Sequence, residues 1–389
     1  MVTTGLWMLA QKHRTGKDLL NSAFTQKVNQ PKCSSLATLP FQIETTTLRK
    51  LKELVSCLSQ PAENTQDTGQ KAEVRNMTEI TEILLLGIPT LQKHKFLSFS
   101  LFLMIYWVTM CGNLLIISLV VHSKNLHSPM YFFLTQLSVC DILMATDIGP
   151  HSEALVPNML YVVLNDGGLI SLLGCITQYL IFCSSACAEC LLLTAMSYDR
   201  YLAICNPLRY TAKMNHKFCF KLVVMCWVIS YSVLLNQAIP ISKLSFCGPH
   251  VIDHFFCDHV PLLELSCSDT YVVKIESNLL SIPFVISPFF IIIFSYIYIV
   301  STILKIPSLT GRHKAFSTCS SHLAAVCIFY GTLISIYAVP KEANSQSISK
   351  LLSLLYTLVT PLINPIIYSF RNKDMHQAFE RYVRNCSMS

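Results

Sequence analysis

The strongest constraint on the fold is a series of seven long apolar runs. A helix of about 20 apolar residues crosses the hydrocarbon core of a bilayer, and each run is near that length or longer. Composition agrees, because 52% of the residues are hydrophobic and only 13% are charged. The sequence therefore predicts an all-α membrane protein, a seven-transmembrane helix bundle. The runs lie at about 96–121, 130–148 (or, with the apolar residues that follow, to 163), 170–196, 218–241, 278–304, 315–339 and 350–370.

Charged residues in the short loops give the orientation of the bundle. Lys and Arg accumulate on the cytoplasmic side of a membrane protein. Here they follow the third, fifth and seventh runs, beginning with Arg200, Lys305 and Arg371. The loop between runs four and five is instead acidic, with Asp253 and Asp258 among its residues. We therefore expect an extracellular N-terminus and a cytoplasmic C-terminus.

The net charge of +7 does not indicate a nucleic-acid partner. Residues 1–75 hold ten Lys and Arg against six Asp and Glu, so this segment carries more than half of the excess. Ser, Thr, Gln, Lys and Asn dominate it, and we expect a disordered N-terminal extension. The partner that the composition predicts is the lipid bilayer.

Two segments follow this extension. Residues 76–371 form the predicted seven-helix domain, which opens on an N-glycosylation sequon at Asn76 on the extracellular side. Residues 372–389 are expected to be a short cytoplasmic tail that contains an amphipathic helix. The residues that suggest this helix are Lys373, Met375, Phe379 and Tyr382.

Four motifs in a fixed order carry a resemblance to a known family. They are LHSPMYFFL at 126–134, MSYDRYLAICNPLRY at 196–210, KAFSTCSSHL at 314–323 and PLINPIIYSFRN at 361–372. Together they resemble the olfactory (odorant) receptor family, a branch of the rhodopsin-like (class A) G-protein-coupled receptors. The resemblance covers residues 76–389, and the extension before residue 76 has no counterpart in it.

The resemblance implies a multi-pass plasma membrane receptor and not an enzyme. It implies a small, volatile, mostly apolar organic ligand in the outer half of the bundle. It also implies activation of a stimulatory, olfactory-type heterotrimeric G protein that raises cyclic AMP. We expect no cofactor apart from a structural sodium ion. The alternative of a seven-span transporter would be expected to show internal repeats and paired broken helices, which we do not find in the sequence.

Six residues are candidates for the switch that couples to the G protein. Arg200 can pair with Asp199 while the bundle is closed, and the resemblance implies that it faces the G protein once released. The alternative is an arginine that only marks the membrane boundary. Pro365 removes a backbone hydrogen bond inside the seventh run and predicts a kink that acts as a hinge. The set is Asp199, Arg200, Tyr201, Asn364, Pro365 and Tyr368.

Polar residues inside the predicted helices form a second candidate site. Such residues are costly in a membrane and need partners in the bundle interior. The resemblance places Asp141 and Asn364 in the same layer as Glu189, and two facing carboxylates favour a shared proton or a bound cation. Our hypothesis is a sodium site, and the alternative is one protonated, hydrogen-bonded carboxyl group. The set is Asn113, Asp141, Glu189 and Asn364.

Four cysteines fall on the predicted extracellular side and are disulfide candidates. They are Cys175, Cys247, Cys257 and Cys267, and they allow three pairings. The resemblance selects Cys175 with Cys257 and Cys247 with Cys267. The alternative is a metal site, since His254, Cys257 and His259 have plausible ligand spacing.

The candidate ligand residues lie in the outer half of the bundle. Helical periodicity above Arg200 places five of them on one face of the third run, and the resemblance supplies the other seven. None is a carboxylate that would bind an amine, so we predict a small, weakly polar ligand bound by burial. The first five are Phe182, Cys183, Ala186, Cys187 and Cys190, and the others are Phe284, Tyr330, Leu333, Ile334, Tyr337, Leu354 and Thr357.

One departure from the family lies after the second run. The chain between Asp141 and Cys175 is about seven residues longer than is usual in the family, and the surplus falls around residues 147–155. Asp147, His151 and Glu153 in this range are poor membrane residues. Either the second helix ends early or it bends around a bulge. Both outcomes would distort the rim of the ligand pocket, so a poorly functional or non-signalling family member is the alternative function.

Overall fold

The computed structural model describes residues 81–88, 93–146, 155–247, 250–338, 346–371 and 373–388. The predicted disordered extension 1–75 and the predicted glycosylation site Asn76 lie outside the described residues, as do residues 147–154 of the surplus segment. Side chains of some helical residues, Tyr337 among them, are also outside this description.

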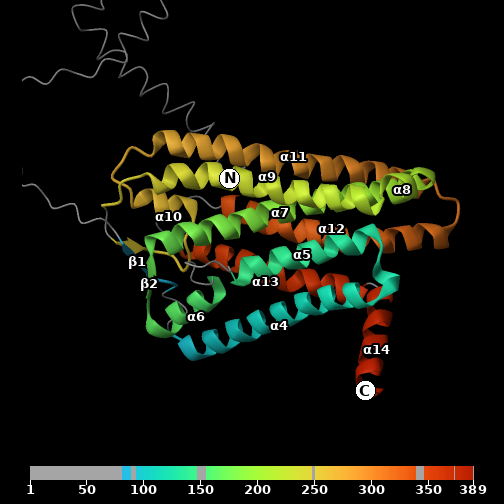
Figure 1. The fold of residues 1–389 in the computed structure, drawn as a ribbon, viewed down its shortest axis with the longest axis horizontal. Helices are drawn as coiled ribbons and strands as arrows, with labels where there is room; N and C mark the ends of the chain where they lie inside the picture. The colour runs from blue at the N-terminus through green and yellow to red at the C-terminus, as the bar shows by residue number, and fades with distance from the viewer. Residues whose placement is uncertain are drawn as a thin grey trace, which may run out of the picture. The chain divides into compact units, whose positions relative to one another are not determined.

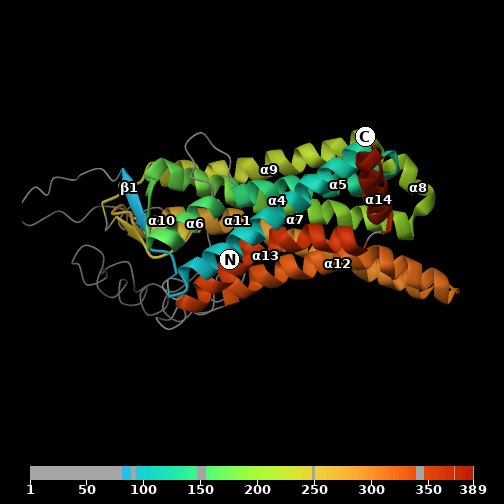
Figure 2. The same ribbon diagram turned by 90° about the horizontal axis from the view of Figure 1, so that it is seen from below.

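Seven helices are long and apolar enough to cross a membrane, which confirms the predicted bundle. They run side by side, with the loops gathered at the two ends (Figures 1 and 2). Among them α7 and α11 each have 34 residues, or about 51 Å, so both extend beyond a hydrocarbon core of about 30 Å. The seven are α4 (Lys95–His122), α5 (Pro129–Thr146), α7 (Leu172–Cys205), α9 (His216–Ser242), α11 (Tyr271–Leu304), α12 (Leu309–Ala338) and α13 (Gln346–Arg371).

Local sequence signals fix several helix starts. The Ser171 hydroxyl accepts a hydrogen bond from the backbone N–H of Gly174, and the Asn215 side chain accepts one from Phe218, so these residues cap α7 and α9. Pro207 occupies the first turn of the short helix α8 (Pro207–Lys213), where its missing N–H costs nothing.

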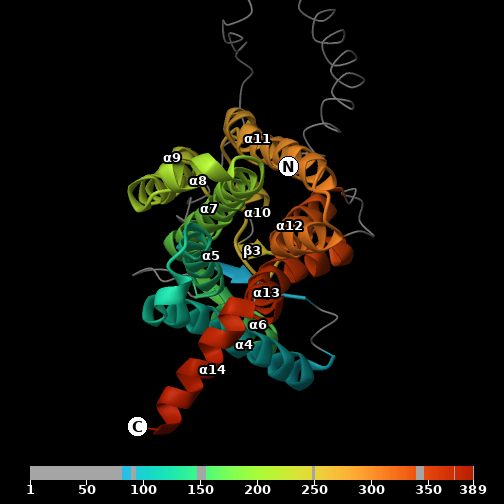
Figure 3. The ribbon, with the colours of Figure 1, turned by 90° about the vertical axis from the view of Figure 1, so that its right-hand side faces the viewer.

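The bundle packs around α7. This helix contacts α5, α9, α11 and α12, and Figure 3 shows it within the ring of helices when the bundle is seen from one end. Large apolar side chains such as Phe96, Trp107 and Phe294 point outward and are exposed. An apolar outer surface is what lipid requires, whereas the buried polar side chains need partners inside the bundle.

We call the end of the bundle that carries Arg200 and α8 the inner end, and the opposite end the outer end. Helix α14 (Lys373–Met388) occupies the predicted tail at the inner end and projects away from the bundle (Figure 3). Met375 and Ala378 on this helix are buried, whereas Tyr382 is partly exposed and its ring lies 6.2 Å from that of His122. The predicted tail therefore contains a helix with an apolar face.

The surplus segment lies between two described helices. Helix α5 is described as far as Thr146, and a further helix, α6 (Leu155–Asn165), packs against α4 and α5. The two alternatives for the surplus segment, an early end or a bulge, concern residues 147–154, which lie outside the described residues.

A three-stranded sheet covers part of the outer end and was not predicted. Its central strand is β1 (Glu82–Leu85), which pairs antiparallel with β2 (Gly168–Ser171) and parallel with β3 (Val251–Ile252). Ile83 and Leu85 of the central strand are fully buried. The segment before the first membrane helix therefore joins two distant loops.

Candidate functional site

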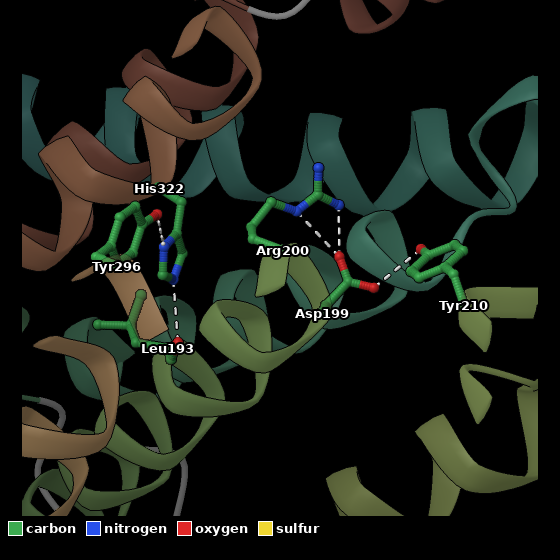
Figure 4. A network of polar contacts seen from close by, with 6 residues as sticks. All are labelled: Leu193, Asp199, Arg200, Tyr210, Tyr296 and His322. Atoms are coloured by element: carbon green, nitrogen blue, oxygen red, sulfur yellow. Dashed lines mark hydrogen bonds and ion pairs between the residues drawn. The ribbon is translucent and has the colours of Figure 1, made fainter. Parts of the chain in front are cut away.

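A buried ion pair lies at the inner end of α7. The Arg200 side chain donates to Asp199 Oδ2 from Nε at 3.0 Å and from Nη2 at 2.5 Å, and the Tyr210 hydroxyl donates to Asp199 Oδ1 at 3.0 Å (Figure 4). Burial, together with the Asp199 carboxylate, raises the pKa of Tyr210, so its hydroxyl remains a donor at neutral pH. Arg200 is therefore held by its neighbour, as expected for the closed bundle.

Tyr201, the next residue of the motif, points elsewhere. Its ring stacks on that of Tyr198 at 6.5 Å and meets Tyr298 of α11 edge-on at 6.2 Å. Its hydroxyl accepts a hydrogen bond from Asn206 at 3.4 Å. Tyr201 thus joins α7 to α11, and the contacts described here are separate from the Asp199 and Arg200 pair.

His322 forms a second junction, which sequence reasoning did not assign. Its Nε2 lies 3.0 Å from the carbonyl oxygen of Leu193 in α7, and its Nδ1 lies 2.7 Å from the hydroxyl of Tyr296 in α11 (Figure 4). A carbonyl oxygen only accepts, so Nε2 carries the hydrogen, and in the neutral ring Nδ1 accepts from Tyr296. One buried imidazole therefore ties α12 to two other helices. The only sequence signal for this role of His322 was its position in the motif at 314–323.

The predicted polar core is assembled in the structure. Asn364 Nδ2 lies 3.1 Å from Asp141 Oδ1, 3.3 Å from Asp141 Oδ2 and 2.9 Å from Glu189 Oε1. Asp141 and Glu189 are fully buried. One amide therefore bridges two carboxylates that come from α5 and α7.

Asn113 joins α4 to α13. Its Nδ2 donates to the carbonyl oxygen of Pro361 at 3.2 Å, which ties α4 to α13 just before Pro365. A Cβ added at Gly112 would lie only 3.1 Å from Pro365, so glycine allows this close approach. Tyr368 is buried, and its hydroxyl has no hydrogen-bond partner within the described ranges. The hinge candidate therefore packs directly against α4.

Both disulfides implied by the resemblance are present. Cys175 of α7 is bonded to Cys257 in the loop between α9 and α11, and Cys247 is bonded to Cys267 within that loop. Gln178 accepts a hydrogen bond from the Cys257 N–H at 2.9 Å. The loop is therefore fixed over the outer end of α7.

The alternative metal site does not form. The Cys257 thiol is consumed by its disulfide, and the described residues contain no cluster of three His, Cys, Asp or Glu suited to a metal ion. Burial lowers the pKa of His254 to about 4, so its ring is neutral at neutral pH. His259 instead lies 2.9 Å from the Ser277 hydroxyl through its Nε2.

Several predicted ligand residues meet in the outer half of the bundle. Cys190 Sγ lies 3.0 Å from the Tyr330 hydroxyl and 3.7 Å from the Phe284 carbonyl oxygen. The Phe182 ring lies 5.5 Å from Phe256 of the loop and 5.9 Å from Tyr356 of α13. Helices α7, α11, α12 and α13 thus contribute to one wall.

The remaining predicted ligand residues divide by exposure. Leu354 and Thr357 are buried, and Cys183, Ala186, Cys187 and Leu333 are half-buried. Ile334 is 44% exposed and does not join the others, because its position on α12 directs it away from the bundle interior. Tyr337 belongs to α12, but its side chain lies outside the described residues.

Two cavities lie away from this wall. One, of about 320 Å³, lies between α11 and α12 and is bordered by Tyr296 and Cys319. The other, of about 670 Å³, lies at the outer end between β1, β2 and α6. Neither of these two cavities is lined by a predicted ligand residue.

The geometry defines a class of protein: a seven-helix membrane receptor with an ion-paired arginine at one end and a disulfide-fixed loop at the other. A family model described as olfactory receptor matches residues 102–385. The chain belongs to the olfactory receptor family, whose members are not enzymes, and it is a multi-pass plasma membrane protein.

Relatives cover most of the chain. It is 43% identical to human (Homo sapiens) olfactory receptor 11L1 over 312 residues, which is 80% of this chain and 95% of that protein. It is 43% identical to rat (Rattus norvegicus) olfactory receptor 1496 over 315 residues, 81% of this chain and 99% of that protein. Human olfactory receptor 11A1 is 45% identical over 302 residues, 78% of this chain and 93% of that protein.

Proposed function

We propose that this odorant receptor activates a stimulatory, olfactory-type heterotrimeric G protein and so raises cyclic AMP. The observation that carries the proposal is the buried contact of Arg200 with Asp199 and Tyr210 at the inner end. The Arg200 side chain is 10% exposed and its guanidinium is held by a neighbouring carboxylate, so it can donate to a partner only after this contact breaks. Opening of the inner end would make it available to a partner.

The ligand is a small, mostly apolar, volatile organic molecule bound in the outer half. The wall around Cys190, Phe182 and Tyr330 supports this, because it offers aromatic surface with one thiol and one hydroxyl as polar groups. Burial of apolar surface contributes about 25 cal/mol per Å², so a small ligand gains most of its affinity from such a wall. Cys190 Sγ lies 3.0 Å from the Tyr330 hydroxyl, so a ligand that binds between these two groups must separate them.

The mechanism is a shift between closed and open bundles. A ligand that binds the open bundle better moves the equilibrium toward it by its difference in affinity for the two forms. Outward movement of the inner end of α12 would break the contact of His322 with Leu193 and leave Arg200 uncovered. Pro365 is the hinge candidate in α13, and Asn364 and Tyr368 flank it.

A structural sodium ion fits the polar core. Sodium prefers oxygen ligands, Asp141 and Glu189 supply carboxylate oxygens, and Glu189 Oε2 has no hydrogen-bond partner in the described part of the chain. A bound sodium ion would supply one positive charge to this layer. Asp141 and Glu189 would hold it, and Asn364 would keep the two carboxylates in place.

Ligand-evoked cyclic AMP in cells that express the olfactory-type G protein tests the proposal. A chemically diverse panel of volatile compounds should contain agonists for the wild-type chain. Arg200→Ala should abolish the response at equal surface expression. A response that survives this substitution would contradict the mechanism.

A non-signalling family member is the second candidate, because the surplus segment joins α5 to α6 next to the proposed ligand pocket. Two observations together would favour this alternative. The chain would reach the cell surface normally but respond to no compound, and Arg200→Ala would not lower basal cyclic AMP.

A further inference from the structure

A buried lysine lies at the outer end of α13, next to the loop between α9 and α11. Lys350 Nζ lies 2.5 Å from Asp253 Oδ1 in that loop and 3.4 Å from the carbonyl oxygen of Gly87. The Lys350 side chain is only 8% exposed, whereas that of Asp253 is 52% exposed. The cation therefore lies inside the protein while its counter-ion remains in contact with water.

Lys350 shares a face of α13 with two candidate ligand residues. Leu354 and Thr357 follow it at spacings of four and seven residues, and all three are buried. Helical rise places Lys350 about 6 Å outward of Leu354 and about 10 Å outward of Thr357. The ammonium group thus lies at the mouth of the site to which the proposed function assigns the ligand.

Aromatic side chains connect this mouth to the wall below. Phe256 lies 4.7 Å from the His254 ring and 5.5 Å from the Phe182 ring. His254 is neutral at neutral pH because burial lowers its pKa to about 4, so the positive charge at this position belongs to Lys350. Asp258 on the same loop accepts a hydrogen bond from the His259 N–H at 2.7 Å and caps α10 (His259–Glu264).

The bond between Lys350 and Asp253 is exchangeable. A half-exposed carboxylate loses little when it returns to water, whereas a buried ammonium left without an acceptor is costly. An incoming group must therefore offer an oxygen acceptor if it is to displace Asp253. An alkane offers none, and an amine adds a second cation.

We propose that Lys350 is a specificity-determining residue that binds a carbonyl or carboxylate oxygen of the ligand, in place of the Asp253 carboxylate that occupies it in the closed receptor. The ligand class is then an apolar chain or ring with a terminal aldehyde, ketone, ester or acid group. This inference rests on the proposed function, because it assigns the ligand of the same site.

Matched compounds test the inference. Straight-chain acids, aldehydes, alcohols and amines of equal carbon number are applied to the wild-type chain and to Lys350→Met, which keeps an apolar stem without the charge. We expect the potency of acids to fall at least tenfold in the variant, because only the carboxylate forms a charge-assisted bond. Aldehydes and alcohols, which offer a neutral acceptor, should lose less, and amines should lose nothing. Equal losses for all four head groups would overturn the inference.

Exchanging the charges of the ion pair distinguishes a role in ligand recognition from structural damage to the loop. Lys350→Asp combined with Asp253→Lys retains an ion pair and should change the preferred head group from acid to amine. The matched control exchanges Lys95 and Asp166, a pair 3.2 Å apart at the outer end of α4, and should leave the preference unchanged. An unchanged preference in the Lys350 and Asp253 exchange would overturn the inference.

Different results would overturn the role of Lys350 and the proposed function. A wild-type chain that responds to alcohols or hydrocarbons but to no acid, aldehyde, ketone or ester overturns the role of Lys350 and leaves the proposed function intact. A chain at the cell surface that responds to nothing and has no basal cyclic AMP dependent on Arg200 overturns both.

Discussion

The ring of His322 in α12 is joined to the carbonyl oxygen of Leu193 in α7, with Nε2 3.0 Å from the oxygen. A hydrogen bond of this kind contributes about 1 kcal/mol, or roughly a fivefold change in an equilibrium. His322→Leu should therefore raise basal cyclic AMP about fivefold at equal surface expression. Thr318→Val, an exposed position on the same helix, is the control. Basal signalling at the wild-type level in His322→Leu would exclude a role for this bond in the closed form.

Tyr210 holds Asp199 from the side opposite Arg200. Tyr210→Phe removes one hydrogen bond and keeps the ring, so basal cyclic AMP should rise about twofold to fivefold. Asp199→Asn removes the charge that holds Arg200 and should have a larger effect. Basal cyclic AMP, measured without ligand at matched surface expression, tests both variants. The reverse order of the two variants would contradict the geometry of the pair.

The polar core predicts a response to sodium. Replacing extracellular sodium with choline should change ligand-evoked signalling of the wild-type chain, because the ion would bind the closed and open bundles differently. Asp141→Ala and Glu189→Ala should remove this sensitivity, whereas Ser185→Ala, one turn from Glu189, should keep it. Sodium sensitivity that persists in both carboxylate variants would rule out the site.

His254 predicts that the outer end loses stability in acid. The folded-state pKa is about 4, and the unfolded value is about 6.5. The contribution of neutral His254 is therefore fully present above about pH 6.5 and is lost as pH falls toward 4. Asp258 and Asp253 favour the protonated ring and Lys350 opposes it.

The measurement is the Tm of the detergent-solubilised receptor between about pH 7.5 and about pH 5. His254→Phe should reduce the fall in Tm, because Nδ1 has no hydrogen-bond partner among the described residues and a phenyl ring fits between Phe255 and Phe256. The exposed His250, replaced by Phe, serves as the control. An equal fall in both variants would assign the effect to other groups.

The membrane helices could be predicted because apolar length is a local property of the sequence. The third run was expected to end at 196, whereas α7 continues to Cys205. Hydropathy falls where Asp199 and Arg200 appear, but the helix does not end there, since the two side chains satisfy each other. Charge therefore marked the membrane boundary and not the helix boundary.

The candidate site was predictable where a family motif supplied the partner. The contact of Asn364 with Asp141 and Glu189 follows the layer that the resemblance implied. The partners of His322 and Lys350 could not be predicted. Leu193 and Asp253 come from distant parts of the chain, and many other residues could offer a hydrogen-bond acceptor to the same side chains. Only the packing of the helices selects among them.

The small sheet escaped prediction for a related reason. Strand β1 has four residues, too few for a reliable periodic signal. Its partners β2 and β3 lie in two loops with no turn sequence that links them to it. Burial of Ile83 and Leu85 beneath those loops stabilises the strand.

The pairing of Leu84 with Val251 has a consequence for biosynthesis. The ribosome makes β1 before any membrane helix, but its parallel neighbour emerges only after four membrane helices have been inserted. Contacts between such distant segments form slowly. The third strand can therefore join the sheet only after the chain between Leu84 and Val251 has been made, whereas β2 is made earlier and can already pair with β1. Until then one edge of β1 is open, and an open strand edge can pair with another chain.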